Sequence, residues 1–248
     1  MYILNPNLPK GEVSAVAISC DAKKAILSLH TLNINTIIVP QNPILPKPVC
    51  THSDLQLLHL CGNRIFISGK HLCAGELEQN FNINRIGEEL GNTYPNDVKL
   101  NCKIIGNNIF LNKRTIAKEI LEFVEYADMN VINVNQGYTG CSICAINESA
   151  IITDDESIFT AAQNFLNDVL LISKGSIRLD GYDYGFIGGC CGKIAENKLA
   201  VNGRIESHKD KYKIIDFISK HNIEAIELSD ETLTDIGGIL PLMEKSSD

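Results

Sequence analysis

Residues 145–173, AINESAIITDDESIFTAAQNFLNDVLLIS, show most clearly the pattern of elements from which we predict the fold. Residues 145–153 predict two short strands joined by an Asn-Glu-Ser turn. Residues 154–166 predict a helix, and its acidic first turn suits the positive end of the helix dipole. Residues 168–173 form a bare apolar run of strand length, which is typical of a buried strand. The stretch therefore predicts one unit with the order strand, strand, helix, strand.

The same order of elements recurs along the chain, which indicates an internal repeat. Further copies are predicted, as hairpin, helix and strand, over residues 103–111, 114–127 and 130–135, and again over residues 193–201, 211–221 and 223–228. The hairpin of an earlier copy is predicted over residues 59–68. The stretch 69–84 fits the repeat worst, and it reads either as an insertion or as a distorted unit.

The two ends of the chain complete the count of units. A strand over 15–19, a helix over 21–32 and a strand over 34–40 make a copy that lacks its first strand. Residues 235–243 predict a first strand with nothing after it. Pairing these two pieces closes a ring of five units, which hides the sheet edges that an open array exposes.

We therefore expect a single domain over residues 1–248, of class α/β, built as a closed five-bladed propeller. A doubly wound α/β domain is the alternative, because alternating strands and helices predict that fold as well. The repeated hairpin argues against it, since a plain winding has one strand for each helix and this chain has three.

Composition limits the classes of function. The chain carries 22 Lys and Arg against 30 Asp and Glu, a net charge of −8, which disfavours general nucleic-acid binding. No apolar run approaches the roughly 20 residues that span a bilayer, so we expect no membrane partner. Nine cysteines without a visible secretory signal favour reduced thiols in the cytoplasm over a disulfide framework. The oligomeric state is left open.

Several short segments, together with the repeat, resemble a known fold. They are HSDLQLLHL (52–60), QGYTGCSIC (136–144), AIITDD (150–155), GYDYGFIGG (181–189) and DIGGILPL (235–242). These segments resemble those of the pentein fold, also called the guanidino-group-modifying-enzyme fold. Within that fold they look like a bacterial branch that has no assigned reaction. That fold is a five-bladed α/β propeller of ββαβ units. Its members include arginine and agmatine deiminases, amidinotransferases, dimethylarginine hydrolases and a non-enzymatic ribosome anti-association factor.

The resemblance implies a cysteine nucleophile, a histidine acid/base two units earlier, and carboxylates that grip the guanidinium. Enzymes of this fold usually carry the cysteine in the last unit, where this chain reads Gly237-Gly238-Ile239-Leu240-Pro241. In the third unit, counted from the first that begins with a hairpin, His-x-Asp is common, and there this chain reads Thr139-Gly140-Cys141. The usual site is therefore missing from its usual place, and deiminase activity cannot be carried over directly.

A rotated version of the site is present. His52-Ser53-Asp54 resembles the His-x-Asp pair, and the glycine-rich run over 137–142 resembles the approach to the nucleophile. Asp97 falls in the unit between them. The resemblance then implies Cys141 as nucleophile, His52 as acid/base, and Asp54 and Asp97 as carboxylates that bind a cation. Carboxylates match the planar donor fork of a guanidinium, and attack on its carbon needs a thiol whose pKa is lowered by a nearby cation or histidine.

Each of these residues also has an ordinary structural interpretation. Cys141 could be an inert buried thiol, and His52, Asp54 and Asp97 could be turn or surface residues. The Cys141-x-x-Cys144 spacing also allows a zinc or redox site. A zinc site needs two more ligands, and a redox pair usually opens a helix, whereas a strand is predicted after Cys144.

Gly188 and Gly189 could form a phosphate-cradling loop, but the spacing of the phosphate-binding motif is missing. The stronger interpretation is a close approach of backbones at the ring centre, where glycine fits. Asp183 and Asp235, with Asp180 and Tyr182, are expected to line the same mouth.

Two functions of different classes follow. The first is a cysteine-dependent hydrolase or transferase acting on a small cationic guanidino or amidino compound, with no metal and no cofactor. The second is a non-catalytic pentein that acts as a binding or assembly factor, as Leu240 and Pro241 at the usual nucleophile segment suggest.

Overall fold

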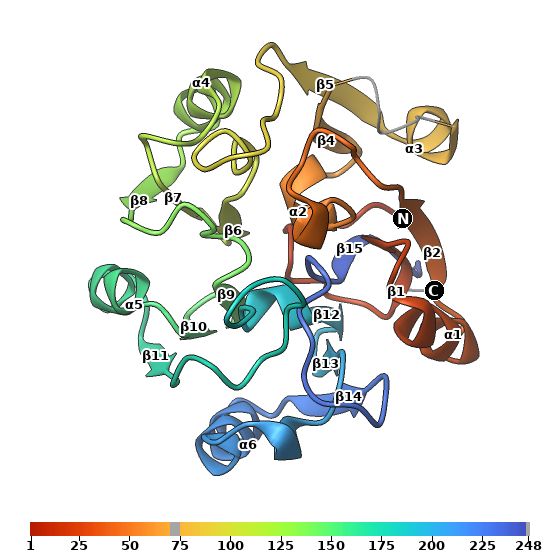
Figure 1. Ribbon diagram of the computed structural model, residues 1–248, viewed down its shortest axis with the longest axis vertical. Helices are drawn as coiled ribbons and strands as arrows, with labels where there is room; N and C mark the ends of the chain where they lie inside the picture. The colour runs from red at the N-terminus through yellow and green to blue at the C-terminus, as the bar shows by residue number, and fades with distance from the viewer. Residues whose placement is uncertain (70–74, 247–248) are drawn as a thin grey trace.

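The computed structural model describes residues 1–69 and 75–246. Within these residues the strands form five three-stranded sheets, which surround a common centre while most of the helices lie at the rim (Figure 1). The fold therefore has the five strand–strand–helix–strand units that the sequence predicts.

The elements of the five units follow the chain. The first unit holds β1 (Val13–Ser19), α1 (Lys23–Thr31), β2 (Asn35–Val39) and, from the other end of the chain, β15 (Leu240–Glu244). The second holds the short α2 (Ser53–Gln56), β3 (Leu57–Cys61), β4 (Arg64–Ser68), α3 (Gly75–Asn80) and β5 (Asn82–Ile86), after the 3-10 turn η1 (Lys47–Val49). The third holds β6 (Lys103–Ile105), β7 (Asn108–Leu111), α4 (Lys118–Tyr126) and β8 (Asn130–Asn133).

The fourth unit holds β9 (Ile143–Asn147), β10 (Ala150–Thr153), α5 (Glu156–Ala162) and β11 (Asp168–Leu171). The fifth holds η2 (Gly188–Cys190), β12 (Cys191–Ala195), β13 (Lys198–Val201), η3 (Ile205–Ser207), α6 (Lys211–Lys220) and β14 (Glu224–Glu227). In every unit the first two strands pair antiparallel, and the helix returns the third strand parallel to the second.

The two ends of the chain meet in one sheet. β15 pairs antiparallel with β1, with Leu240 opposite Ala17 and Pro241 opposite Val16. The Met1 amino group also donates to the Glu244 carbonyl at 2.6 Å. The first strand missing at the N-terminus is therefore supplied by the C-terminus, as the sequence predicts.

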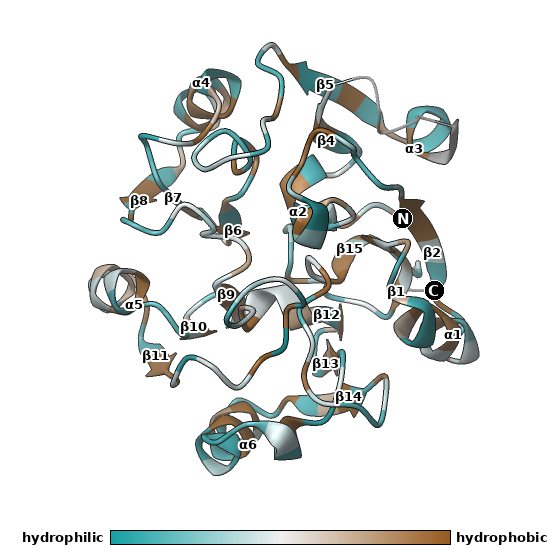
Figure 2. Ribbon diagram, in the orientation of Figure 1, coloured by the Kyte–Doolittle hydropathy of each residue, from teal (hydrophilic) through white to brown (hydrophobic). Residues whose placement is uncertain are grey.

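The apolar core lies between neighbouring units. Five clusters of buried side chains each join two adjacent sheets, and together they complete the circle. One cluster, for example, joins Phe110 of the third unit to Ile151 of the fourth. The rim helices are amphipathic, with buried positions such as Ile120 on α4 and Phe217 on α6, and Figure 2 shows both hydropathy classes on them. Burial of these faces drives assembly of the ring.

Some predicted boundaries and environments were wrong. The last strand begins at Leu240, not at 235, because Gly237 and Gly238 have φ of 73° and 79° and shape a loop. The helix predicted from 114 begins at Lys118. β11 is half-buried along its whole length, because it is the edge strand on the outer side of its sheet, whereas β9 at the other edge faces the ring centre (Figure 1).

The stretch 69–84 is a distorted unit where it is described. Its described part contains α3 and the start of β5, which pairs parallel with β4, so it supplies the expected helix and third strand. Residues 70–74 lie outside the described residues. No helix in the described ranges combines the length and apolarity needed to cross a membrane.

Candidate active site

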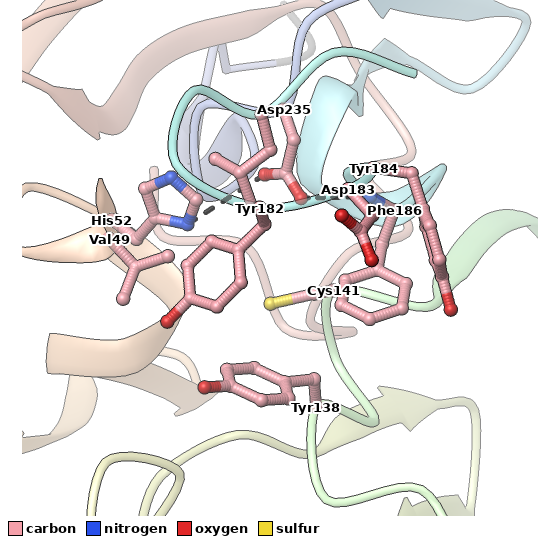
Figure 3. A pocket seen from close by; sticks show the side chains of 10 residues that line it. Val49, His52, Tyr138, Cys141, Tyr182, Asp183, Tyr184, Phe186 and Asp235 are labelled. Carbon is pink, nitrogen blue, oxygen red and sulfur yellow. Dashed lines mark hydrogen bonds and ion pairs between the residues drawn. The ribbon is translucent and has the colours of Figure 1, made fainter. Parts of the chain in front are cut away.

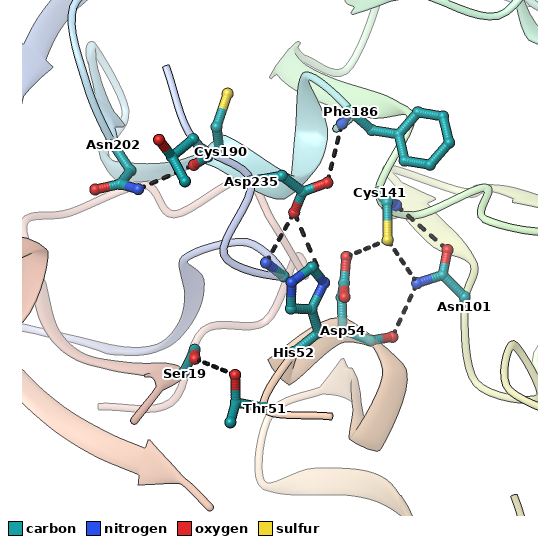
Figure 4. Close-up of polar contacts among 12 residues, drawn as sticks. Ser19, Thr51, His52, Asp54, Asn101, Cys141, Phe186, Cys190, Asn202 and Asp235 are labelled. Carbon is teal, nitrogen blue, oxygen red and sulfur yellow. Dashed lines mark hydrogen bonds and ion pairs between the residues drawn. The ribbon is translucent and has the colours of Figure 1, made fainter. Parts of the chain in front are cut away.

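Each unit presents the segment just before its first strand to the ring centre. This shared position brings together residues far apart in sequence (Figure 4). These segments carry His52 and Asp54 before β3, Asn101 before β6, Cys141 before β9, Gly188 and Gly189 before β12, and Asp235 before β15. The two-unit separation of His52 and Cys141 matches the rotated register that the sequence predicts.

The thiol of Cys141 is buried at the centre of this cluster, with 2% of its surface exposed. It donates to Asp54 Oδ2 at 2.8 Å, and its Sγ accepts from Asn101 Nδ2 at 3.2 Å. Burial, followed by the charges of Asp54 and Asp235, raises the pKa of Cys141 well above its ordinary value. A lowered thiol pKa was expected from the sequence, but the charged groups that face Cys141 are the carboxylates of Asp54 and Asp235, which raise it. The thiol is therefore protonated when the pocket is empty.

Asn101 holds the loop that carries Cys141, and it was not predicted as a site residue from the sequence. Its Nδ2 donates to the Asp54 carbonyl at 3.1 Å as well as to Cys141 Sγ. Its Oδ1 accepts from the backbone N–H groups of Gly140 at 2.7 Å and Cys141 at 3.3 Å. The repeat could have indicated Asn101, because it lies two residues before the first strand of its unit, the same position that Cys141 has in the next unit.

His52 and Asp235 form the second polar pair of the cluster. His52 Nδ1 lies 3.7 Å from Asp235 Oδ1, and both side chains are buried. Asp235 also accepts backbone N–H bonds from Phe186 at 2.9 Å and from Gly237 at 3.0 Å. Burial raises the pKa of Asp235, while the neighbouring His52 opposes that rise. The backbone thus fixes the carboxylate that faces the histidine.

A pocket of about 200 Å³ opens onto these groups (Figure 3). His52, Cys141, Asp183 and Asp235 line it, so four of the sequence-predicted residues come together there. The remaining lining residues are apolar or aromatic, and they are Val49, Tyr138, Leu179, Tyr182, Tyr184 and Phe186. Of these, only Tyr182 was expected at the mouth by sequence reasoning.

Asp54 and Asp97 lie outside the lining of this pocket. Asp54 borders a separate cavity of about 20 Å³ behind Cys141, together with Lys103, and its Oδ1 has no hydrogen-bond partner among the described residues. Asp97 is buried and accepts a hydrogen bond from the Tyr138 hydroxyl. Burial and then Asp97 raise the pKa of Tyr138 above its ordinary value. Asp54 thus contacts the Cys141 thiol, and Asp97 orients Tyr138 in the pocket wall.

Gly188 and Gly189 permit close packing behind the pocket. A Cβ on Gly188 would lie 2.3 Å from the Ile143 carbonyl oxygen, and one on Gly189 would lie 2.0 Å from Asp235 Oδ1. The Gly189 N–H donates to the Cys141 carbonyl at 2.9 Å. These contacts agree with a close approach of backbones and not with a loop that cradles phosphate.

None of the other seven described cysteines lines the pocket. The eight cysteines in the described ranges are free thiols. Cys144 and Cys191 pack in the same buried cluster, and contact with Cys144 raises the pKa of Cys191. Among the described residues no group of three or more His, Cys, Asp or Glu side chains is arranged to hold a metal ion.

Residues 17–240 match the model of a family described as "Family of unknown function (DUF6873)". This chain belongs to the DUF6873 family. No curated protein matches the DUF6873 chain in sequence. Solved structures are similar to it in fold at about one residue in ten identical.

One similar structure is an amidinotransferase of saxitoxin biosynthesis from Microseira wollei, with a TM-score of 0.60, 10% identity and 98% of each chain covered. Another is an agmatine deiminase from C. jejuni, with a TM-score of 0.59, 10% identity, and 100% and 98% of the chains covered. A third is DDAH from Pseudomonas aeruginosa in complex with citrulline, with a TM-score of 0.56, 9% identity, and 92% and 96% covered. The DUF6873 chain therefore has the pentein fold of guanidino-modifying enzymes.

The DUF6873 chain departs from the usual pentein pattern at its last strand, β15. Leu240 sits at the start of β15 and packs in the apolar cluster with Ala17 and Leu57, and Pro241 follows it in the strand. Neither side chain can serve as a nucleophile. The thiol at the ring centre is that of Cys141, at the entry to the fourth unit.

Proposed function

We propose that this protein is a cysteine-dependent hydrolase or transferase that acts on the guanidino or amidino group of a small cationic molecule. The observation that supports this most is the pocket in which the Cys141 thiol, His52 and the carboxylates of Asp183 and Asp235 share one lining. The pentein fold, common to the similar structures, adds support for the same chemistry.

The electrostatics of the pocket favour a cation. A guanidinium is planar and permanently charged, and it pairs with carboxylates through a fork of N–H donors. Its charge would oppose the effect of Asp54 and Asp235 on Cys141, because a nearby positive charge lowers a thiol pKa. The thiol would then become reactive when substrate is bound, and it would stay protonated in the empty pocket.

The contacts assign a role to each group. The Cys141 proton passes to Asp54 Oδ2, 2.8 Å away, and Sγ attacks the amidinium carbon, which forms a C–S bond. Protonated His52, paired with Asp235, gives its proton to the departing amine as the C–N bond breaks. Neutral His52 then takes a proton from water or an acceptor amine, which attacks the same carbon. The C–S bond breaks, and Sγ recovers its proton from Asp54, while Asn101 keeps Sγ in place.

A non-catalytic binding protein is the alternative. It is favoured by the raised pKa of Cys141 and by the missing nucleophile at the usual segment, 237–241. Such a protein would keep the pocket as a receptor for a cation, and its thiol would not turn over any ligand.

Release of ammonia or amine from a panel of guanidino compounds separates the two functions. We expect turnover by the wild-type protein, and loss of turnover in Cys141→Ser and His52→Ala. Cys144→Ser is the matched control, because Cys144 is equally buried three residues away and does not line the pocket. Adding a primary amine distinguishes transfer from hydrolysis. Turnover that survives Cys141→Ser, or no turnover across the panel, would refute the proposal.

A further inference from the structure

One loop builds half of the pocket wall. Residues 172–187 connect β11 to η2 and pass over the ring centre (Figure 1). The loop supplies five lining residues, which are Leu179, Tyr182, Asp183, Tyr184 and Phe186. The composition of this loop therefore largely decides what the pocket accepts.

The aromatic rings of the wall support one another. Phe186 stacks on Tyr138 with centroids 5.9 Å apart and planes at 26°. Tyr184 meets Phe186 edge-on at 5.9 Å, and Tyr94 stacks behind Tyr138 at 6.3 Å. Rings held in such arrangements lose little freedom when a ligand packs on them. The pocket thus offers an aromatic surface that is organised before binding.

The loop is anchored beside the reacting groups. Arg178 donates its backbone N–H to the Leu233 carbonyl at 2.8 Å, and its carbonyl accepts from the Asp235 N–H at 2.9 Å. The Gly185 N–H donates to the Ile177 carbonyl at 2.8 Å, and a Cβ on Gly185 would lie 2.5 Å from Asp235 Cβ. These contacts fix the distance between the aromatic wall and the Asp235 carboxylate.

Carboxylates dominate the charge of the lining, because its one potential cation, His52, already faces Asp235 at 3.7 Å. The ten described residues that line the pocket include no lysine and no arginine, whereas Asp183 and Asp235 are both acidic. Arg178, next to Leu179 in sequence, already binds Asp180 through two N–H groups at 2.7 and 2.8 Å. A ligand carboxylate in this pocket would lie near like charges and would have to compete with Asp235 for His52, which is unfavourable.

The size of the pocket favours a small ligand. Its volume of about 200 Å³ lies below the roughly 300–1,000 Å³ of common small-molecule sites. A planar cation also stacks well on aromatic faces, and an apolar body buries surface against Val49 and Leu179.

We propose that this pocket selects a small guanidine or amidine that carries no carboxylate and has a flat, apolar body. The inference deepens the proposed function, since it names the substrate class of the same site. It rests on the aromatic wall and on the carboxylates that dominate the charge of the lining.

Calorimetric titration of the full-length Cys141→Ser protein tests this selectivity without turnover. Two pairs of probes isolate the two features: agmatine and arginine differ by a carboxylate, and phenylguanidine and methylguanidine differ by a ring. We expect agmatine to bind at least tenfold more tightly than arginine, and phenylguanidine at least tenfold more tightly than methylguanidine. Adding Phe186→Leu should reduce the second ratio at least threefold. Tyr212→Leu is the control, because Tyr212 is exposed on α6.

The outcomes separate this inference from the proposed function. Equal binding of agmatine and arginine, or a phenyl preference that Phe186→Leu leaves unchanged, would overturn the selectivity while guanidinium binding still supports the function. Failure of all four probes to bind would overturn both. Selective binding without turnover by the wild-type protein would leave the selectivity standing and refute the enzyme.

Discussion

Replacing Asn101 by alanine tests whether this buried amide holds the loop that carries Cys141. Asn101 is 1% exposed and makes four hydrogen bonds within the cluster. Asn101→Ala removes them all and leaves two backbone N–H groups, of Gly140 and Cys141, without their acceptor. The Asp54 carbonyl also loses a donor.

The size of the effect follows from that count. A typical intramolecular hydrogen bond contributes about 1 kcal/mol net, so four bonds give a loss of about 4 kcal/mol. In a chain of this size 1 kcal/mol shifts Tm by about 2–4 °C, so we expect Tm to fall by roughly 8–16 °C. Asn112→Ala is the matched control, because Asn112 is also a buried amide, with bonds to Asn135 and Arg114, away from the pocket. Its two bonds predict about half the loss of stability.

Thermal unfolding of both variants, together with the turnover assay, is the measurement. Asn101→Ala should lose both stability and turnover, because Cys141 is no longer positioned. Asn112→Ala should lose stability alone. A melting temperature for Asn101→Ala within about 1 °C of the wild type, or equal loss of turnover in both variants, would refute the role assigned to Asn101.

Three further changes have definite expected results. Asp54→Asn removes a charge that raises the pKa of Cys141, so the pH profile of Cys141 alkylation should move to lower pH. A profile that does not move would contradict the contact between Asp54 and Cys141. Gly189→Ala places a Cβ against the Asp235 carboxylate and should lower Tm strongly, whereas a Cβ at Gly11 has its nearest contact at 3.5 Å, so Gly11→Ala should not. Equal melting temperatures of the two variants would show that Gly189 and Asp235 do not approach closely. Burial raises the pKa of Asp154 to about 7 in the folded chain, so folding takes up a proton and stability falls as pH rises from about 4 to about 7. Asp154→Asn should therefore raise Tm relative to wild type more at pH 8 than at pH 5. A gain in Tm that is the same at both pH values would contradict the raised pKa of Asp154 as its cause.

The repeat made most of the fold predictable. The hairpin, helix and strand of the unit at 145–173 are local patterns, and each recurs with the same order. Pairing of β15 with β1 was predictable because the two ends lacked complementary pieces of one unit. Boundaries such as Leu240 and Lys118 were not, since positive φ at Gly237 and the packing of Ile116 outside the helix depend on the assembled ring.

The site was predictable in part. His52, Cys141, Asp183 and Asp235 were predicted as site residues, and the structure places all four in the lining of one pocket. The environment of the thiol was not, because the facing groups come from three other units of the ring. The aromatic wall was missed for a similar reason: Tyr184 and Phe186 sit on a loop whose path is set by long-range bonds to 233–235.

The most direct test of the account compares alkylation of native protein by 2-chloroacetamidine and by 2-chloroacetamide, mapped to each cysteine by mass spectrometry. The two reagents have the same shape and the same leaving chloride, but only the amidine is a cation. The account predicts a preference for the amidine at Cys141 at least tenfold greater than at the exposed Cys61, and loss of that preference in Asp235→Asn. The same amidine preference at Cys141 and Cys61 would contradict a cation-selective nucleophile at the centre of the ring.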